Sequence, residues 1–380
     1  MQSSDDRRIV LLGIGHTNAH VLDMWRREPI ARARLVCVSG FASATYSGML
    51  PGTLSGQYPP GTLEIELRSL AQAARAELVV EPARTVDMET RTVRFDDHEP
   101  VPFDVLSVGA GSVPNRAGID ASPGAWVPIK PMQTFLMRLY ERLQELRRDG
   151  LKAIRVVVIG GGVGGLEISL CLPSYLGRVA GGTPHAISII DAGERIGGGL
   201  SPRARHRVES VVASRGVEVV TGTRVTRVED GAVVCADGRR LPADLVVLAA
   251  GAAPPPVVEN MTLPKDPRGF LLTRDTLQST GPANVFAVGD SGTVAEAGTP
   301  KAGVYAVRQG PVLWNNIGAL VRGEPLTPYE PQHDFLRLLN TGDGKALMDY
   351  KGWTAHARWC WRFKDYLDSR FMARFRVTRG

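Results

Sequence analysis

The sequence predicts an α/β fold with two Rossmann-like dinucleotide-binding domains, the second inserted into the first, and a C-terminal α+β or helical extension. Two glycine-rich turns are the main observation: Gly13-Ile14-Gly15-His16-Thr17-Asn18 and, 147 positions later, Gly160-Gly161-Gly162-Val163-Gly164-Gly165. Each turn directly follows an apolar run of strand length, Ile9–Leu12 and Val156–Ile159. The order strand, glycine turn, helix is the one that pyrophosphate binding requires. One such motif is a weak signal, but a pair indicates one protein that holds two dinucleotides, most simply FAD and NAD(P).

The glycines of each turn have separate tasks. The first makes the tight turn, the second lets the backbone approach the phosphates, and the third lets helix and strand pack closely. Free N–H groups and the positive end of the helix then hold the phosphate charge. The candidate residues are Gly13, Gly15 and His16 in the first turn, and Gly160, Gly162 and Gly165 in the second.

Four segments follow the first turn. A second strand is expected at Leu35–Val38, and Ser47–Gly52 is expected to be a loop or a broken helix because it is rich in glycine and proline. We expect a helix over Leu63–Ala76. The alternating residues Arg84–Phe95 predict strands.

Two buried strands with similar endings indicate that the internal repeat is one of whole domains. Phe103–Gly109 runs into Gly-Ala-Gly-Ser-Val-Pro, which contains Gly111, and Leu245–Leu248 runs toward Ala-Gly-Ala-Ala-Pro-Pro. Met132–Arg148 has apolar residues at helical spacing and is expected to bridge the two units. The strand Asn284–Asp290 ends in Gly-Asp where the first domain would resume. A carboxylate there can accept hydrogen bonds from sugar-alcohol hydroxyls.

These elements set the expected domain boundaries. We expect the first, FAD-binding domain in residues 1–117 and 271–325, the NAD(P)-binding domain in residues 118–270, and a C-terminal domain with a basic amphipathic helix in residues 326–380.

Composition favours a cytoplasmic protein. Residues 1–8 contain no apolar stretch of signal-peptide length, and no apolar run approaches the roughly 20 residues of a membrane-spanning helix. The cysteines, Cys37, Cys171, Cys235 and Cys360, are scattered without a CxxC motif. This spacing excludes a sequence-adjacent dithiol pair and an ordinary zinc site, so no metal is expected.

The C-terminal segment carries the net charge of +6. Residues 351–380 hold eight Lys or Arg and two Asp, and apolar residues recur every four positions at Trp359, Phe363, Leu367, Phe371 and Phe375. A basic helix with an aromatic stripe is typical of a membrane-surface anchor, here on the inner face of the membrane. The same stripe also fits a helix that packs on its own domain or on a second subunit in a homodimer. Nucleic acid is not the expected partner, because the aromatic content favours these alternatives.

Together the motifs resemble the two-dinucleotide-binding-domain flavoproteins of the pyridine nucleotide-disulfide oxidoreductase superfamily. The layout is similar to that of type II NADH dehydrogenases and sulfide:quinone oxidoreductases. It is most similar to the NADH-dehydrogenase-like flavoprotein module found fused to selenide, water dikinase. The segments that carry this resemblance cover essentially the whole chain: Gly13–His16, Tyr46–Gly52, Gly160–Glu167, Val288–Asp290, Pro300–Gly310, Thr341–Asp343 and Phe363–Leu367.

The resemblance implies an oxidoreductase that takes hydride from NADH onto FAD and passes electrons to a small, quinone-like acceptor. It implies that Asp290 binds the ribityl chain or pyrophosphate of FAD and that the backbone at Ala302 and Gly303 faces the isoalloxazine. The helix bearing Lys301, Tyr305 and Gln309 would lie at the flavin and supply the catalytic residues, although Tyr305 stands where the first glutamine of the type II enzymes would align. Lys301 could equally stabilise negative charge on reduced flavin.

Glu167 and Asp191 belong to the predicted NADH site. In the resembled family an acid at Glu167 can orient the nicotinamide ribose or carboxamide, and the alternative is a carboxylate stabilised by the helix dipole. Asp191 ends the strand Ala186–Ile190, where a carboxylate binds a ribose 2′-hydroxyl and repels a 2′-phosphate. This favours NADH over NADPH, although the nearby Arg195 could bind a 2′-phosphate and favour NADPH instead.

The sequence departs from the usual dinucleotide-binding pattern at two places, and two alternative functions stay open. Asn18 replaces the third glycine of the first turn, and Ser39-Gly40 replaces the acid that often binds the adenosine ribose. Cys171 leaves open a sulfide- or selenium-related flavoprotein that uses cysteine, with Cys360 as a second thiol, although buried core cysteine is the commoner fate. A flavin-binding partner or sensor with little turnover is the other alternative.

Overall fold

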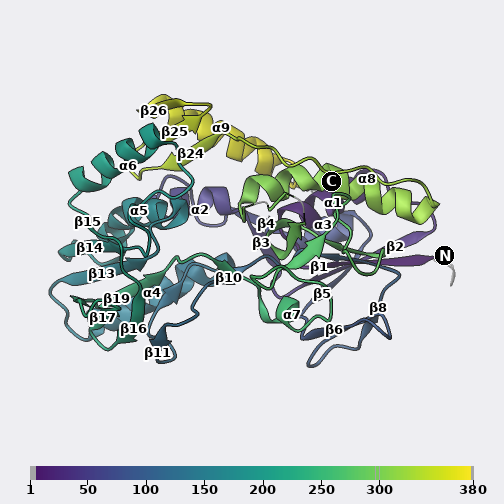
Figure 1. Ribbon diagram of the computed structural model, residues 1–380, viewed down its shortest axis with the longest axis horizontal. Helices are drawn as coiled ribbons and strands as arrows, with labels where there is room; N and C mark the ends of the chain where they lie inside the picture. Colours follow the sequence, from purple (N-terminus) through teal and green to yellow (C-terminus); the bar gives the residue numbers. More distant parts are fainter. Residues whose placement is uncertain (1–5, 296, 299, 378–380) are drawn as a thin grey trace.

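The computed structural model describes residues 6–295, 297–298 and 300–377. It has two lobes, each built on a parallel sheet, with an extension that runs across one side of both (Figure 1). Residues 1–5, part of the segment used to judge a signal peptide, and Arg379 of the basic tail lie outside the described residues.

The first lobe is organised by a five-stranded parallel sheet in the order β22-β9-β1-β2-β5. Four strands precede the second lobe in sequence and β22 follows it, so the second lobe is an insertion. Alternate residues of β1 enter two separate apolar clusters, with Ile9 and Leu11 on one face and Val10 and Leu12 on the other. Burial of both faces is typical of a parallel sheet. The strands are β1 (Arg7–Leu12), β2 (Ala33–Ser39), β5 (Glu77–Val80), β9 (Val105–Val108) and β22 (Val285–Ala287).

Helices cover one face of this sheet. The helices α1 (His16–Arg27) and α8 (Gly303–Arg322) lie side by side, and an edge-on contact between Trp25 and Trp314 joins them. The remaining elements on this side are the pair β3 (Ser43–Thr45) and β4 (Glu64–Glu66), the 3-10 helix η1 (Ser47–Met49), α2 (Leu50–Ser55) and α3 (Leu67–Ala73).

The second lobe repeats the plan with the parallel sheet β12-β19-β13-β14-β15. Its helix α5 (Val163–Val179) follows the second glycine turn as α1 follows the first. The bounds are β12 (Val127–Pro128), β13 (Ile154–Ile159), β14 (His185–Ile190), β15 (Glu218–Val220), β19 (Leu245–Leu248), α4 (Met132–Arg148) and α6 (Pro202–Ser214).

Each lobe also carries a small sheet with antiparallel strand pairs, and this strengthens the repeat. The first has β6 (Thr85–Asp87), β7 (Thr92–Arg94) and β8 (Val101–Pro102); the second has β11 (Asp120–Ala121), β16 (Val225–Glu229), β17 (Ala232–Cys235) and β18 (Arg240–Pro242). Short elements complete the lobes: β10 (Val113–Pro114) paired with β20 (Ala252–Ala253), β21 (Leu271–Thr273) paired with β23 (Gly292–Val294), α7 (Pro256–Glu259) and η2 (Gly289–Ser291).

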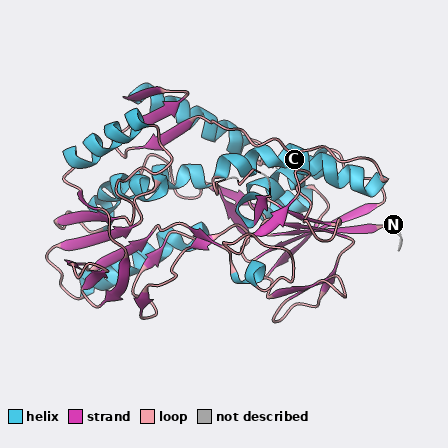
Figure 2. Cartoon of the chain, viewed as in Figure 1, coloured by secondary structure: helices cyan, strands magenta, loops and turns pink. Residues whose placement is uncertain are grey.

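The extension is an antiparallel sheet followed by one helix. The strands β24 (Arg337–Asn340), β25 (Ala346–Tyr350) and β26 (Trp353–Ala357) lie against α5 and α6 of the second lobe. The helix α9 (Arg358–Ala373) then runs from there to the first lobe (Figures 1 and 2). No helix among the described residues is both long and apolar enough to span a membrane.

The predicted fold class and the bridging helix Met132–Arg148 are confirmed. Ser47–Gly52 is the broken helix η1–α2. The single helix over Leu63–Ala76 was wrong at its start, because residues 64–66 pair with β3. The helix begins only after Glu66, whose carboxylate accepts hydrogen bonds from the first free N–H groups, those of Arg68 and Ser69.

The tail helix is present, and the aromatic stripe is not its main buried face. The residues buried on α9 are Cys360, Lys364, Asp368 and Met372, one position beyond the aromatic stripe. Lys364 and Asp368 can be buried because they pair with each other at 2.7 Å. Of the stripe, Phe375 is buried and Phe371 packs on the first lobe, whereas the side chains of Trp359, Phe363 and Leu367 are 52%, 40% and 37% exposed.

Candidate functional site

The first glycine turn has the geometry of a phosphate-binding turn. Gly13 has φ +79°, and a Cβ there would lie 2.6 Å from Ala110 Cα, so only glycine fits. Gly15 precedes α1 without a side-chain cap, which leaves the first N–H groups of the helix free to bind an anion.

Asn18, which replaces the third glycine, is accommodated by a glycine on the neighbouring strand. Its amide donates to Gly13 O at 2.7 Å and accepts from Ser107 Oγ at 2.7 Å. A Cβ on Gly109 would lie 2.6 Å from Asn18 Nδ2. The space that a third glycine would open is therefore provided by Gly109. The hydrogen bonds of the Asn18 side-chain amide hold the turn against β9.

The second turn keeps its glycines for three different reasons. Gly160 has φ +113° and approaches Ala249 O, and a Cβ on Gly165 would lie 1.9 Å from Gly160 O. A Cβ on Gly162 would meet no protein atom within 4 Å. Gly160 and Gly165 therefore shape the turn, while Gly162 faces open space at the start of α5 where a pyrophosphate would come.

Asp191 lies beside this second turn. Its carboxylate accepts from the N–H groups of Gly161 at 2.5 Å and Gly193 at 2.7 Å. Arg195 is held by Glu209 through two bonds of 2.9 and 2.6 Å, at the outer surface. The carboxylate thus stands at the turn, and the arginine that could bind a 2′-phosphate is already paired.

Asp290 is the centre of a charged group where the two lobes meet. Its Oδ2 accepts from Ser112 Oγ at 2.6 Å and from Lys130 Nζ at 2.9 Å. Lys130 follows β12 of the second sheet, whereas Asp290 follows β22 of the first. Burial alone would raise the pKa of Asp290, but Lys130, Ser112 and Lys301 together hold it below its ordinary value. The carboxyl ends of the two sheets therefore meet at one ion pair.

Sequence reasoning missed Lys130. The signal that could have identified it is its position directly after the strand that follows the first lobe, in Ile-Lys-Pro. Gly111, which sequence reasoning did include, has φ +77° and donates from its N–H to Ser291 Oγ at 2.9 Å, which joins the ends of β9 and β22.

The helix α8 begins at the same place, with Ala302 as its N-cap and Gly303 as its first residue. A Cβ on Gly303 would lie 3.5 Å from Ser47 Oγ, which in turn lies 3.5 Å from His16 Nε2. Neither α1 nor α8 has a side-chain cap. Two helix N-termini therefore converge beside Ser47.

The three residues predicted to be catalytic have different environments. Gln309 is buried and accepts from Gly289 N at 2.6 Å, so it fixes the loop before Asp290. Tyr305 is buried with its ring against Phe335. The Lys301 ammonium donates to the Gly292 carbonyl at 2.6 Å and to a threonine hydroxyl, and burial lowers its pKa to about 8.

Glu167 faces the C-terminal extension. Its Oε1 accepts from Asn340 N at 2.8 Å, on β24. Burial raises the pKa of Glu167 to about 7, although Lys364 acts in the opposite direction. Lys364 donates to Gly48 O at 2.8 Å and pairs with Asp368, which accepts from the Tyr46 hydroxyl at 2.9 Å. Sequence reasoning missed this cluster, because its members come from four separate segments.

His16 is covered by aromatic rings. The centre of its ring lies 5.3 Å from that of Tyr46 and 5.9 Å from that of Phe371 on α9. The rings of Tyr46 and Phe371 stack with their centres 4.5 Å apart. Burial lowers the pKa of His16 to about 4, so the ring is neutral at pH 7. Within the described residues no group of three potential ligands surrounds a metal position.

The cysteines do not form a redox pair among the described residues. All four are buried and free. Burial, together with the nearby Glu167, raises the pKa of Cys171 well above its ordinary value. A reactive cysteine needs the opposite shift. No observation favours the cysteine alternative.

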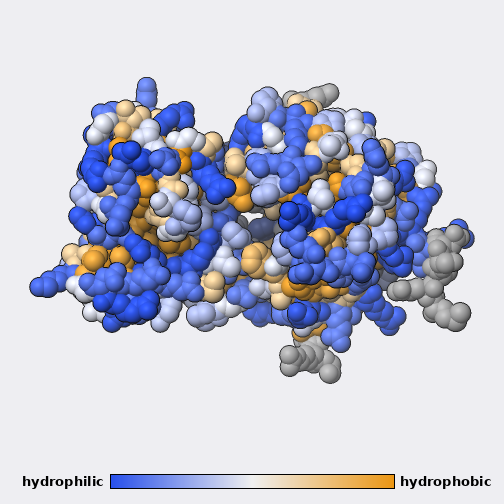
Figure 3. Space-filling model, turned by 90° about the horizontal axis from the view of Figure 1, so that it is seen from below, coloured by the Kyte–Doolittle hydropathy of each residue, from blue (hydrophilic) through white to orange (hydrophobic). Residues whose placement is uncertain are grey.

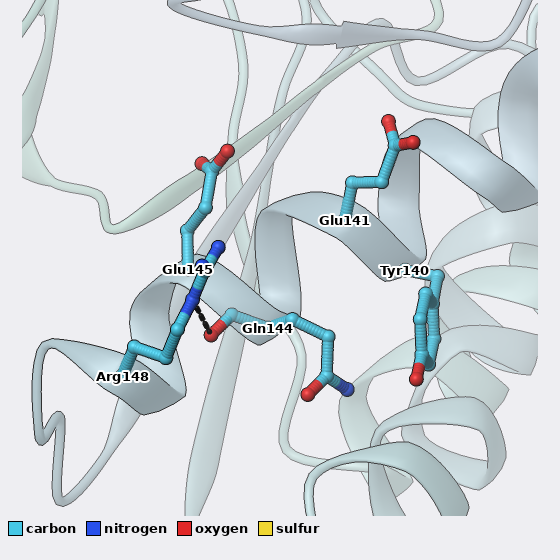
Figure 4. A pocket seen from close by; sticks show the side chains of 5 residues that line it. All are labelled: Tyr140, Glu141, Gln144, Glu145 and Arg148. Carbon is cyan, nitrogen blue, oxygen red and sulfur yellow. Dashed lines mark hydrogen bonds between the residues drawn. The ribbon is translucent and has the colours of Figure 1, made fainter.

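Viewed from below, the surface is hollowed between the two lobes (Figure 3). A different hollow, of about 500 Å³, lies on the outside of α4 and contains none of the predicted site residues. Figure 4 shows its side chains, all from this one helix, without convergent partners. The candidate site is therefore the region between the lobes.

Known proteins share this architecture. Demethylphylloquinone reductase NdbB from Synechocystis sp. is 26% identical over 357 residues, which are 82% of this chain and 86% of that protein. The NADH dehydrogenase-like protein YutJ from Bacillus subtilis is 23% identical and covers 77% of this chain and 78% of its own length. Among solved structures, NDH2 from Plasmodium falciparum in complex with NADH superposes with a TM-score of 0.82, at 15% identity and 97% coverage of both chains.

Sulfide:quinone oxidoreductase from Aquifex aeolicus is also similar in structure, with a TM-score of 0.80 at 18% identity, covering 97% of this chain and 91% of its own. The family described as pyridine nucleotide-disulphide oxidoreductase matches residues 26–310. This match begins at the end of α1, after the first glycine turn, and runs through the second lobe to the first half of α8. The chain therefore belongs to the pyridine nucleotide-disulphide oxidoreductase family.

Proposed function

We propose that this protein is an FAD-dependent NADH dehydrogenase that passes electrons to a quinone-like acceptor. The observation that carries the proposal is the contact between Lys130 and Asp290, at 2.9 Å. It brings the carboxyl ends of two dinucleotide-type sheets together, and ligands of such sheets bind at those ends. Two dinucleotides held at these turns would have their reactive ends close together.

The first lobe fits FAD. Gly13, Gly15 and the free N–H groups of α1 would hold its pyrophosphate, with Gly111 at the neighbouring strand end. Asp290, kept ionised by Lys130, would accept hydrogen bonds from the ribityl hydroxyls. Ala302 and Gly303 form the positive end of α8, which would lie beside the isoalloxazine and stabilise negative charge on the reduced ring.

The second lobe fits NADH. Gly160 and Gly165 shape the turn, and Gly162 leaves room for the pyrophosphate. Asp191 stands where it would accept from the ribose hydroxyls, and Arg195 is paired with Glu209, which supports NADH over NADPH. The bound flavin would supply two-electron chemistry that no side chain has.

The residues around the site would orient the cofactors and move protons. Gln309 fixes the Gly289 backbone, Tyr305 lies on the same helix α8, and Lys301 lies just before the N-cap of that helix, not on it as expected. Glu167 has a pKa of about 7 and lies near Lys364, so it can hold or release a proton at neutral pH. This arrangement suits an acceptor that takes up protons with its electrons, as a quinone does.

The quinone-like acceptor is also supported by relatives. NdbB is by name a demethylphylloquinone reductase, and a relative from Haemophilus influenzae, 24% identical over 188 residues, is a type II NADH:quinone oxidoreductase. Because quinones of this kind dissolve in lipid, a surface that reaches the membrane would serve the same reaction.

We infer that α9 docks the protein on the inner face of a membrane, as a cytoplasmic, peripheral protein. The outer face of α9 exposes Trp359, Phe363 and Tyr366, interleaved with Arg362, and Trp353 before it is 77% exposed. Aromatic and basic residues together match an anionic lipid surface. The alternative is that a second copy of the chain packs on this face. A vesicle-binding experiment distinguishes the two.

Anaerobic reduction of the FAD-loaded protein tests the proposed reaction. NADH should bleach the flavin bands, NADPH should do so at a far higher concentration, and sulfide should have no effect. Addition of a water-soluble quinone should then restore the colour. If sulfide reduces the flavin and NADH does not, the cysteine-based alternative replaces this proposal; if neither does, the protein is a binding module.

A further inference from the structure

Three arginines line a hollow of about 280 Å³ at the far edge of the first sheet. Arg8 and Arg34 lie near the start of the adjacent strands β1 and β2 and are partners in register, and Arg91 lies in the turn between β6 and β7. The first glycine turn follows the opposite end of β1, about 17 Å from Arg8 along the strand. The hollow is therefore separate from the cofactor sites.

The positive charge in this hollow is only partly balanced, because the one carboxylate among the described residues that line it, Asp104, accepts from the backbone N–H of Arg8 at 2.6 Å and not from a guanidinium. Within the part of the chain that the structure describes, Arg8, Arg34 and Arg91 make no ion pair. The Nε atoms of Arg8 and Arg34 are buried and have no hydrogen-bond partner there. Burial and the nearby Arg34 lower the pKa of Arg8, although Glu77 and Asp104 act in the opposite direction. Such buried donors are costly to leave unsatisfied.

The second lobe provides an internal reference for Arg8. At the equivalent place, Asp244 N donates to Arg155 O and Arg155 N donates to the Asp244 carboxylate, just as Asp104 and Arg8 do. The Arg155 guanidinium then forms two bonds with Asp244, of 2.8 and 2.6 Å. The Arg8 guanidinium instead reaches the Pro102 carbonyl at 3.4 Å. The backbone allows the ion pair, and Arg8 does not form it.

The other two arginines have no counterpart in the second lobe. Arg34 pairs with Arg8 in register, whereas Arg155 pairs with Ala186. Arg91 accepts from Phe103 N just as Gly231 accepts from Ala243 N, both at 2.9 Å. Both have positive φ, +53° for the arginine and +74° for the glycine. Glycine adopts this conformation without strain and arginine does not, so the first lobe keeps a strained arginine beside two others.

We propose that Arg8, Arg34 and Arg91 form a binding site for a phosphate-type oxyanion. Guanidinium groups match such anions in shape and charge, and the hollow is large enough for pyrophosphate. An anion would bond the unsatisfied Nε groups and separate the like charges. Inorganic phosphate and the phosphate of a nucleotide share this chemistry.

Calorimetric titration with pyrophosphate tests the site, at constant ionic strength. The protein is loaded with FAD and saturated with NAD⁺, so that both glycine turns are filled. The double variant Arg34→Ala with Arg91→Gly reproduces the residues of the second lobe and should bind at least about tenfold more weakly. Arg7→Gln, on the opposite face of β1, should bind like wild type. Titration with orthophosphate and AMP then distinguishes the free anion from a nucleotide phosphate.

Thermal unfolding gives a second readout, in which the double variant has the higher melting temperature without anion and only wild type is stabilised by pyrophosphate. Without anion the double variant should melt above wild type, because it loses the repulsion and the strain, while pyrophosphate should raise the melting temperature of wild type only. FAD content should be unchanged in both. The proposal is overturned if wild type binds no pyrophosphate, if the double variant binds equally well, or if Arg7→Gln loses binding to the same extent.

Discussion

Gly162→Val should separate the NADH site from the rest of the protein. Gly162 has φ −68° and ψ 176°, a conformation open to any residue, and a Cβ there meets no protein atom within 4 Å. The cost to the free energy of unfolding should therefore be no more than about 1 kcal/mol, the loss of a tolerated N-cap residue. The fold and bound FAD should survive.

The effect on NADH should be far larger. The valine side chain would occupy the space of the pyrophosphate and remove about two charge-assisted hydrogen bonds to backbone N–H groups, each about 1.5–3 kcal/mol. The sum of about 3–6 kcal/mol corresponds to a loss of affinity of roughly 100- to 20,000-fold. Stopped-flow bleaching of the flavin over a range of NADH concentrations measures this shift, and dithionite confirms that the flavin can still be reduced.

Two neighbouring glycines are the controls. Gly164→Ala also meets open space, but inside the helix, and should change neither stability nor NADH affinity greatly. Gly165→Ala would place a Cβ 1.9 Å from Gly160 O and should destabilise the lobe by about 3 kcal/mol. Tight NADH binding by a folded Gly162→Val protein would refute the assignment of this turn to the dinucleotide.

The other predictions concern FAD, a proton and the membrane. Asp290→Asn should weaken FAD binding about 10- to 100-fold, through loss of charge-assisted hydrogen bonds, as measured by FAD retained after dialysis; Asp97→Asn on the surface is its control, and equal retention would contradict the assignment. The Glu167 pKa, raised from 4.5 to about 7, means that the native state binds the proton more tightly, so the stability that Glu167 contributes relative to Glu167→Gln should fall by about 2–3 kcal/mol between pH 5 and 8. Urea unfolding of Glu167→Gln should lack that fall, and an identical pH profile would sink the idea. Replacing Trp359 and Phe363 together by serine should abolish binding to anionic vesicles while FAD is retained, whereas Tyr140→Ser, equally exposed on α4, should bind normally. Binding that persists in the double variant, or wild type that dimerises without binding vesicles, would assign the face to another partner.

Much of the fold followed from the sequence because it depends on neighbouring residues. The apolar runs before Gly13 and Gly160, and the helical spacing over Met132–Arg148, are local patterns with a fixed period. The duplicated strand, turn and helix units also follow a connection rule that leaves few topologies. The fold class and the family could therefore be predicted before any contact was known.

The tertiary structure decided the pairings between distant residues. Lys130 meets Asp290 across 160 positions, and Gly109 makes room for Asn18 from another strand. No local pattern encodes such contacts, because they depend on how two sheets and their helices are placed. The departure at Asn18 could be noticed in the sequence, but its compensation could not.

The helix α9 shows the same division. The sequence alone determined that residues near 358–375 form a basic helix with aromatic residues every four positions. Which face is buried was decided by the partners of Lys364 and Asp368, namely Gly48 O and the Tyr46 hydroxyl, which satisfy their polar groups and leave Trp359 and Phe363 outside. The pair within α9 leaves further polar groups to satisfy, and the segment that satisfies them is some 320 residues away in the sequence.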